Sequence, residues 1–319
     1  MHILINPPLS RLFEDLMAVA LDSIVNGFTA YAKNWRSLCG PFLHVIGLQM
    51  LCLVATIGLD ILLLSGASPS NFSQRYGVVL VAEFSLGLLL LYGMVLLFAS
   101  AYKPMDDALA GSPISKWREN VRPQMRNASQ LLLFRLLCIA GAVALFIAAF
   151  IPAMFLGVTI GGLASLFTIM ACLAIAGGLS LVGLALTEFV EMEVLLGRKG
   201  LMDAISSSSR IVLANPLELL LFLLIWLSFL FVSYIAMMVL IYALEIVGLF
   251  IMMPLLFFGG PVGILLGMGL YVLVMLLAAL IVMSVYYLIA TPLLLLSLIG
   301  LWRSLAEKEG IVRDGWSRR

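Results

Sequence analysis

The chain has 319 residues, of which 63% are hydrophobic and only 11% charged, and its mean hydropathy is +1.17. Soluble domains carry roughly 25% charged residues, so lipid rather than water must cover much of this chain. The net charge of +1 argues against a nucleic-acid partner, which needs a basic surface. We therefore expect an all-α integral membrane protein with a single transmembrane domain over residues 1–319.

Apolar segments long enough to cross a bilayer recur along the chain. A membrane-spanning helix needs about 20 apolar residues, and six segments meet this length: residues 41–64, 78–101, 131–156, 163–186, 217–241 and 262–288. Pro292 follows the sixth, and we predict that the chain leaves the bilayer there. A further apolar run, residues 248–258, contains Pro254 and is too short to span, so we predict a re-entrant or interfacial segment.

The Lys and Arg residues are unevenly divided between the two sides of the predicted membrane. All but two of the 18 lie before the first span, after the second, after the fourth or in the C-terminal tail. The exceptions are Arg75, between spans one and two, and Arg135, inside span three. Positive charge favours the cytoplasmic side. We therefore predict a multi-pass protein of the cell membrane with both termini in the cytoplasm.

Helical segments that are polar on one side precede spans one, three and five. The third of them opens the stretch LMDAISSSSRIVLANPLELLLF, residues 201–222. Amphipathic helices of this kind suit the headgroup plane. Each segment ends at an asparagine that we predict turns the chain into the membrane: Asn34, Asn127 and Asn215. The pattern suggests three repeats of an in-plane amphipathic helix and two spans, at 9–110, 111–197 and 198–309, although any six-span protein with cytoplasmic termini shows similar alternation.

Two groups of charged residues lie within or beside the predicted spans. Asp60, Glu83 and Glu245 lie near the outer ends of spans one, two and five. They are candidates for an outer acidic site for a cation or proton, or else they simply reach water at the ends of their helices. On the inner side, Arg135 lies one turn inside span three. Because an unpaired Arg facing lipid is costly, we predict a structural ion pair with Glu188 or Glu191 at the end of span four.

Three glycines at intervals of four residues open the sixth span. Gly259, Gly263 and Gly267 share one helical face, where the missing side chains allow another helix to approach closely. The partner helix lies either within the same chain, which we favour, or in a second copy.

Motifs for catalysis and metal binding are missing from the sequence. The chain has two histidines, His2 and His44, and no HExxH, GxSxG or P-loop pattern. Its four cysteines lie in or beside apolar runs without a C-x-x-C pair, as expected of reduced, buried thiols. We therefore expect a non-enzyme with no catalytic residues, cofactor or metal.

The plan of an in-plane helix followed by a pair of spans resembles the membrane domain attached to some glycerophosphoryl diester phosphodiesterases, and similar prokaryotic multi-pass proteins. The resemblance covers approximately residues 9–305, and residues 201–222 are its most suggestive stretch. The phosphodiesterase barrel itself has no counterpart here. The resemblance therefore implies a membrane fold but no hydrolase activity, and it transfers no functional residue.

Three functions are compatible with these features. The leading hypothesis is a structural, accessory or membrane-organising protein whose cytoplasmic in-plane helices contact lipid headgroups or a partner, either another membrane-protein subunit or a second copy. The alternative is a transporter or channel for small solutes or ions, which would need a continuous polar cavity reaching the middle of the membrane. The third is an intramembrane hydrolase, for which the sequence offers only the shallow pair Asp60 and Glu83.

Overall fold

The computed structural model describes residues 9–64, 72–160 and 162–310, and these segments are helical along nearly their whole length. No strand occurs in these three segments, so the predicted all-α fold is confirmed for them. The elements are α1 (Leu9–Leu64), α2 (Phe72–Leu109), α3 (Trp117–Ile160), α4 (Gly162–Leu195), α5 (Leu201–Ala214), α6 (Pro216–Phe258), α7 (Gly260–Val285), a π-helical turn (Tyr286–Ala290) and α8 (Thr291–Lys308).

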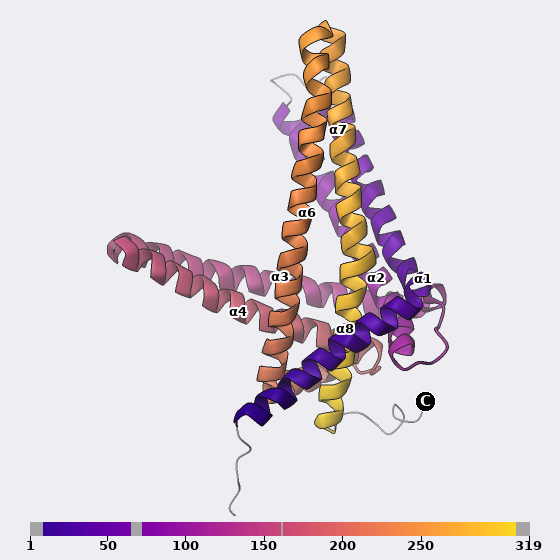
Figure 1. Ribbon diagram of the computed structural model, residues 1–319, viewed down its shortest axis with the longest axis vertical. Helices are drawn as coiled ribbons and strands as arrows, with labels where there is room; N and C mark the ends of the chain where they lie inside the picture. Colours follow the sequence, from indigo (N-terminus) through magenta and orange to yellow (C-terminus); the bar gives the residue numbers. More distant parts are fainter. Residues whose placement is uncertain (1–8, 65–71, 161, 311–319) are drawn as a thin grey trace, which may run out of the picture.

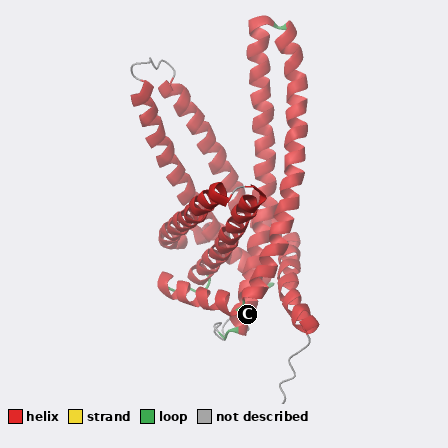
Figure 2. Ribbon diagram, turned by 90° about the vertical axis from the view of Figure 1, so that its left-hand side faces the viewer, coloured by secondary structure: helices red, strands yellow, loops and turns green. Residues whose placement is uncertain are grey.

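Three long helical hairpins diverge from a common base. The second part of α1 pairs with α2, α3 pairs with α4, and α6 pairs with α7. Figure 1 shows the α1–α2 and α6–α7 hairpins rising while the α3–α4 hairpin points to one side, and Figure 2 shows the same divergence from a second direction. The first part of α1, in indigo, lies obliquely across the base. Each of the three predicted repeat ranges contains one hairpin.

The hydrophobic core lies in the base, where the ends of the hairpins meet α5 and α8. Its largest fully buried side chains come from seven different helices and include Phe42, Tyr102, Leu131, Phe189, Phe222 and Leu296. Helix α8 is buried on most of its circumference, because α1 and α2 pack along it. The base therefore resembles a small globular domain, because its apolar side chains are buried in a common core.

The outer parts of the hairpins expose large apolar side chains instead. Phe250 in α6 is 73% exposed and Phe155 in α3 is 71% exposed. Five helical segments are long and apolar enough to cross a membrane: Met17–Leu62, Ser73–Leu109, Trp117–Pro152, Pro216–Leu255 and Leu266–Lys308. In α4, the part predicted as span four, the structure describes only a shorter apolar stretch, Phe167–Gly178. The all-helical fold with several apolar helices is that of a membrane protein.

Two of the three predicted asparagine turns are wrong. Asn34 and Asn127 lie inside α1 and α3, which continue through them without a break. The Asn34 amide donates to the Ala30 carbonyl one turn back at 3.0 Å, and the Asn127 amide donates to the Gln124 side chain at 2.8 Å, so both are satisfied within the helix. Asn215 does end α5, because Pro216 follows it and the proline ring disfavours helical geometry at the preceding residue.

The predicted re-entrant segment at 248–258 is also wrong. These residues are the last part of the continuous helix α6, with Pro254 inside it. The chain then turns at Gly259 and Gly260, and Gly260 has a φ of +57°, which favours glycine. A proline removes one hydrogen bond but need not end a helix that is held along its length by a neighbour, and α7 packs along α6 here.

Gly259, in the turn between the two helices, and Gly263 and Gly267 of α7 make that packing close. A Cβ at Gly263 would lie 2.3 Å from the Leu255 carbonyl oxygen, and one at Gly259 would lie 2.6 Å from the same atom. At Gly267 a Cβ would lie 3.2 Å from the Met252 side chain. The small-residue face is therefore turned toward α6 of the same chain.

A π-helical turn separates α7 from α8, just before Pro292. Pro292 has no N–H group to donate to the carbonyl of Leu288, four residues earlier. The Tyr31 hydroxyl from α1 donates to this carbonyl instead, and the Cys39 thiol lies 3.9 Å from it. The helix changes its winding at Pro292 but does not end there, and side chains of α1 replace the lost backbone hydrogen bond.

Candidate functional site in the base

An ion-pair cluster joins α3, α4 and α2 in the base. Arg135 donates from Nε to Glu191 Oε1 and from Nη2 to Glu191 Oε2, the latter at 2.8 Å. Its Nη2 lies 3.5 Å from Glu188 Oε1, and the Tyr102 hydroxyl donates to Glu188 Oε2 at 2.9 Å. The structure thus brings the three residues of the predicted ion pair together and adds a tyrosine, which the sequence reading missed.

The charge on Glu191 depends on opposing influences. Burial raises the pKa of this carboxyl and the nearby Glu188 raises it further, whereas the Arg135 guanidinium and the Tyr102 hydroxyl oppose the rise. The net effect is a pKa of about 7. Glu191 lies beyond the end of the predicted fourth span, and only 2% of it is exposed. Because the carboxyl is buried, its protonation is coupled to the packing of the base.

A second network joins α2 to α8. Arg303 donates from Nη2 to the backbone carbonyl of Asp106 at 3.1 Å and to its carboxylate. Lys103 donates to Asp107 at 2.6 Å, and the Ser115 backbone N–H donates to the other oxygen of Asp107 at 3.1 Å. Sequence reasoning missed this network. The adjacent carboxylates at 106 and 107, placed just after an apolar span, were the signal that could have revealed it.

Two further ion pairs lie at the edge of the base. Lys308 at the end of α8 donates to Glu218 at the start of α6 at 2.7 Å. Lys199 lies 2.7 Å from Glu193, across the turn between α4 and α5. Because each carboxylate is nearly buried and each lysine is partly exposed, these pairs hold helix ends together at the edge of the core.

The first part of α1 has an apolar stripe that the base does not cover. Its members recur at helical spacing and are 40–58% exposed: Leu21, Val25, Phe28 and Trp35. The Phe28 ring packs edge-on against Phe229 of α6, with ring centroids 6.2 Å apart, so the stripe continues onto the α6–α7 hairpin. Arg36 lies beside Trp35, 5.6 Å from its ring centroid. Aromatic and basic residues side by side are typical of a membrane–water interface.

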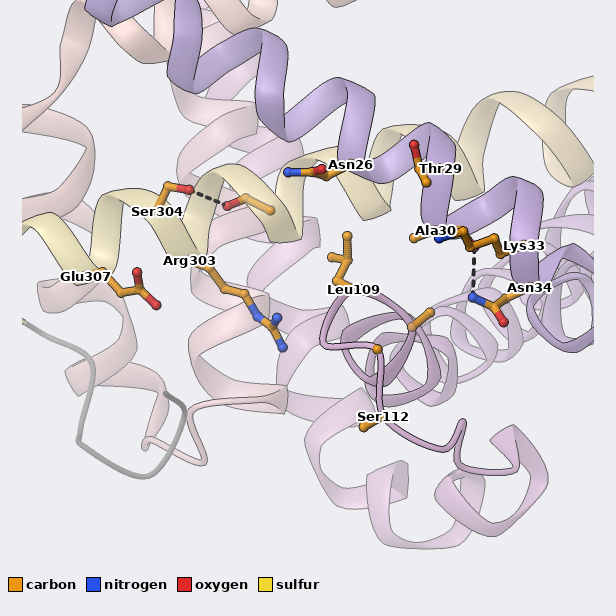
Figure 3. Close-up of a pocket in the computed structure, with 13 residues that line it drawn as sticks. Asn26, Thr29, Ala30, Lys33, Asn34, Leu109, Ser112, Arg303, Ser304 and Glu307 are labelled. Carbon is orange, nitrogen blue, oxygen red and sulfur yellow. Dashed lines mark hydrogen bonds between the residues drawn. The ribbon is translucent and has the colours of Figure 1, made fainter. Parts of the chain in front are cut away.

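The opposite face of α1 lines a polar cleft of about 630 Å³. Helices α1 and α8 cross closely at Gly27, where a Cβ would lie 2.6 Å from the Ser297 hydroxyl. Beside this crossing the two helices and the turn after α2 enclose the cleft, whose polar walls are Asn26, Thr29, Lys33, Asn34, Ser112, Arg303, Ser304 and Glu307. Figure 3 shows Arg303 pointing from α8 into the space toward Leu109. This cleft was not expected from the sequence.

The three predicted outer acidic residues lie on three different helices. Asp60, Glu83 and Glu245 lie on α1, α2 and α6, so the third belongs to a different hairpin from the first two. Glu245 accepts a hydrogen bond from Tyr271 of α7 at 3.3 Å. Within the three described segments, no group of three His, Cys, Asp or Glu side chains is placed to hold a metal ion.

Comparison with known proteins identifies a family but no activity. Residues 113–298, more than half of the chain, match the family of unknown function DUF7544. The chain belongs to this family. No curated protein and no solved structure matches it. The matched region contains most of the base, including Arg135, Glu191 and Glu218, while α1 and α2 precede it. The resemblance to the membrane domain of glycerophosphoryl diester phosphodiesterases stays a prediction.

Proposed function

We propose that this member of DUF7544 is a non-enzymatic, membrane-organising protein of the cell membrane, with six spans and with its base and both termini on the cytoplasmic side. The exposed stripe on α1 is the observation that carries the proposal. An apolar face of this size would be unfavourable in water, and the contact of Phe28 with Phe229 makes it continuous with the apolar surface of α6, which supports a lipid-facing position. The partners are membrane lipids, contacted by the in-plane part of α1.

The proposed role is mechanical rather than chemical. Ion pairs and a packed core join three hairpins that diverge into the surrounding lipid. Such a base would hold the hairpins at set angles while lipids or neighbouring subunits occupy the spaces between them. The transporter alternative needs a polar path along the spans. Nothing favours it here, because the polar cleft lies in the base and the outer acidic residues are divided between hairpins.

Cysteine accessibility tests the orientation of α1. In a variant without the native cysteines, Val25→Cys is placed in the apolar stripe and Asn26→Cys is the matched control on the cleft face. We expect a water-soluble maleimide to label Asn26→Cys rapidly in proteoliposomes and Val25→Cys at least roughly tenfold more slowly, because lipid covers position 25. Equal labelling of the two positions would contradict a lipid-facing stripe.

The side of the membrane is tested separately. Lys116 lies in the turn before α3 and its side chain is 82% exposed. We expect Lys116→Cys to be labelled in inverted vesicles but not in sealed cells. Labelling from outside intact cells would overturn the cytoplasmic placement of the base without affecting the accessibility result for α1.

A further inference from the structure

The cleft between α1, α8 and the turn after α2 has the dimensions of a ligand site. Its volume of about 630 Å³ lies within the range of small-molecule sites in proteins, roughly 300–1,000 Å³. Polar side chains from α1, from the turn at Ser112 and from α8 converge on it, so three separate chain segments form its walls. Because most of the polar lining side chains carry a hydroxyl or amide group, the site suits a polar ligand.

The cleft faces water rather than lipid. Asn26 and Lys33, seven residues apart, share one face of α1, and the lipid-facing stripe with Val25 and Phe28 lies on the roughly opposite side of the helix. None of the lining residues is an exposed large apolar side chain. A molecule that enters the cleft therefore comes from the aqueous phase.

Lys33 favours an anion in the cleft, and Arg303 adds N–H donors there although Asp106 pairs with its charge. Arg303 is held in place by the carbonyl and carboxylate of Asp106, and its guanidinium points into the cleft. Lys33 adds a second cation on the opposite wall. It forms no ion pair with the residues that the structure describes. Glu307 is the acidic residue among the lining side chains. Arg and Lys together are the usual partners of phosphate and carboxylate groups.

We propose that this cleft binds a small, water-soluble, hydroxyl-rich molecule that carries a phosphate or carboxylate group. Lys33 and Arg303 contact the anionic group, and Asn26, Thr29 and Ser304 contact the hydroxyl groups. Because the site is formed by α1, α8 and the end of α2, the bound molecule ties the first hairpin to the base. The proposal does not depend on the membrane-organising role.

Calorimetric titration and thermal unfolding of the purified full-length protein test this site. The probes are glucose 6-phosphate, inorganic phosphate and, as an uncharged match, glucose, all at constant ionic strength so that general screening does not change. We expect saturable heat and a rise in Tm with glucose 6-phosphate and a weaker response with phosphate. We expect no response with glucose. A response to glucose equal to that with its phosphate would overturn the anion assignment.

Three variants localise the response. Lys33→Gln removes one cation, and we expect binding to weaken roughly tenfold, the usual scale of one charge-assisted hydrogen bond. Ser304→Leu fills the cleft from the α8 wall and should abolish binding while leaving the ion pairs intact. Lys116→Gln is the matched control, because this exposed lysine lies outside the cleft. If all three variants bind as the original protein does, the cleft is not the site.

A further experiment tests whether the anionic group in the cleft belongs to a lipid headgroup or to a soluble molecule. Ser112→Cys, which places a thiol in the wall of the cleft and keeps both proposed cations, is exposed to maleimide in nanodiscs of phosphatidylcholine alone or with phosphatidylglycerol. We expect glucose 6-phosphate to slow labelling equally in both membranes, as a soluble ligand would. Protection that requires phosphatidylglycerol and is insensitive to glucose 6-phosphate would assign the cleft to a lipid headgroup and overturn the proposal of a soluble ligand.

Discussion

Different interactions stabilise the base and the hairpins of this protein. In the base, Phe222 is completely buried and buried carboxylates are matched by Arg or Lys from neighbouring helices. Along the hairpins, Phe250 is 73% exposed and the contacts are mostly between the two helices of one hairpin. The comparison teaches that side-chain contacts specify the base, whereas the hairpins rely on lipid as the solvent for their apolar surface.

The largest expected effect is the loss of Arg135. Arg135→Leu leaves Glu191 buried without its counter-charge, which typically costs about 3–5 kcal/mol, so we expect little folded protein in detergent at pH 8. The double variant Arg135→Leu, Glu191→Leu should regain part of that stability, because no buried charge is left unpaired. Size-exclusion chromatography and thermal unfolding measure both. If Arg135→Leu and Glu188→Leu each fold normally, the ion pair does not hold α3 to α4.

A matched pair of phenylalanine variants tests the two regions directly. Phe222→Ala creates a cavity in the core of the base and should cost about 3–5 kcal/mol. Phe250→Ala removes a side chain that mainly faces solvent or lipid, so the free energy of unfolding should change by less than ~0.5 kcal/mol. Thermal unfolding in the same detergent gives the two shifts in Tm. Similar shifts would mean that the hairpins are packed against something as tightly as the base is.

The crossing of α1 and α8 provides a sharper test of the base. Gly27→Leu places a side chain where the Ser297 hydroxyl lies, and such overpacking costs about 1–3 kcal/mol. Gly47→Leu, farther along α1, meets no neighbouring atom within 4 Å and serves as the control. We expect a lower Tm for the first variant and an unchanged or slightly higher Tm for the second. An equal response would place the close contact elsewhere.

The last comparison concerns pH. The pKa of Glu191 is about 7 in the fold, against an ordinary value of 4.5, so the folded state binds the proton more tightly than the unfolded chain. Its contribution to stability is therefore fully present below pH 4.5 and is lost as the pH rises through about 7. Between these values we expect the Tm of the original protein to fall by a few degrees relative to that of Glu191→Gln. A constant difference between the two proteins across this range would show that Glu191 does not titrate there.

Several features of the fold could be predicted from particular residues. Arg135 within an apolar run required a nearby carboxylate, and Glu188 and Glu191 were the acidic residues at a matching depth. Gly259, Gly263 and Gly267 indicated a close helix contact, since only glycine lets backbones approach so closely. Asn215 before Pro216 marked a helix break because the proline restricts the residue before it. In each case a local covalent or electrostatic constraint was sufficient.

The wrong predictions share a different cause. Asn34, Asn127 and Pro254 have weak local preferences for a turn or a helix end. The two asparagine amides donate within their own helices, and α7 packs along α6 at Pro254. The Asp106–Arg303 pair joins residues from α2 and α8 that are far apart in the sequence. The cleft likewise depends on a crossing at Gly27 and Ser297. Pairings of distant segments leave no periodic signal in the sequence.

The amino-acid sequence by itself determined that this protein is all-helical and that most of its surface needs lipid, because hydrophobicity and length act locally along each helix. The tertiary structure alone decided that three hairpins diverge from one base, that α1 presents an exposed apolar stripe and a polar cleft on different sides, and which charges meet across the core. These features arise from the angles at which the helices cross, and those angles depend on many side chains packing at once.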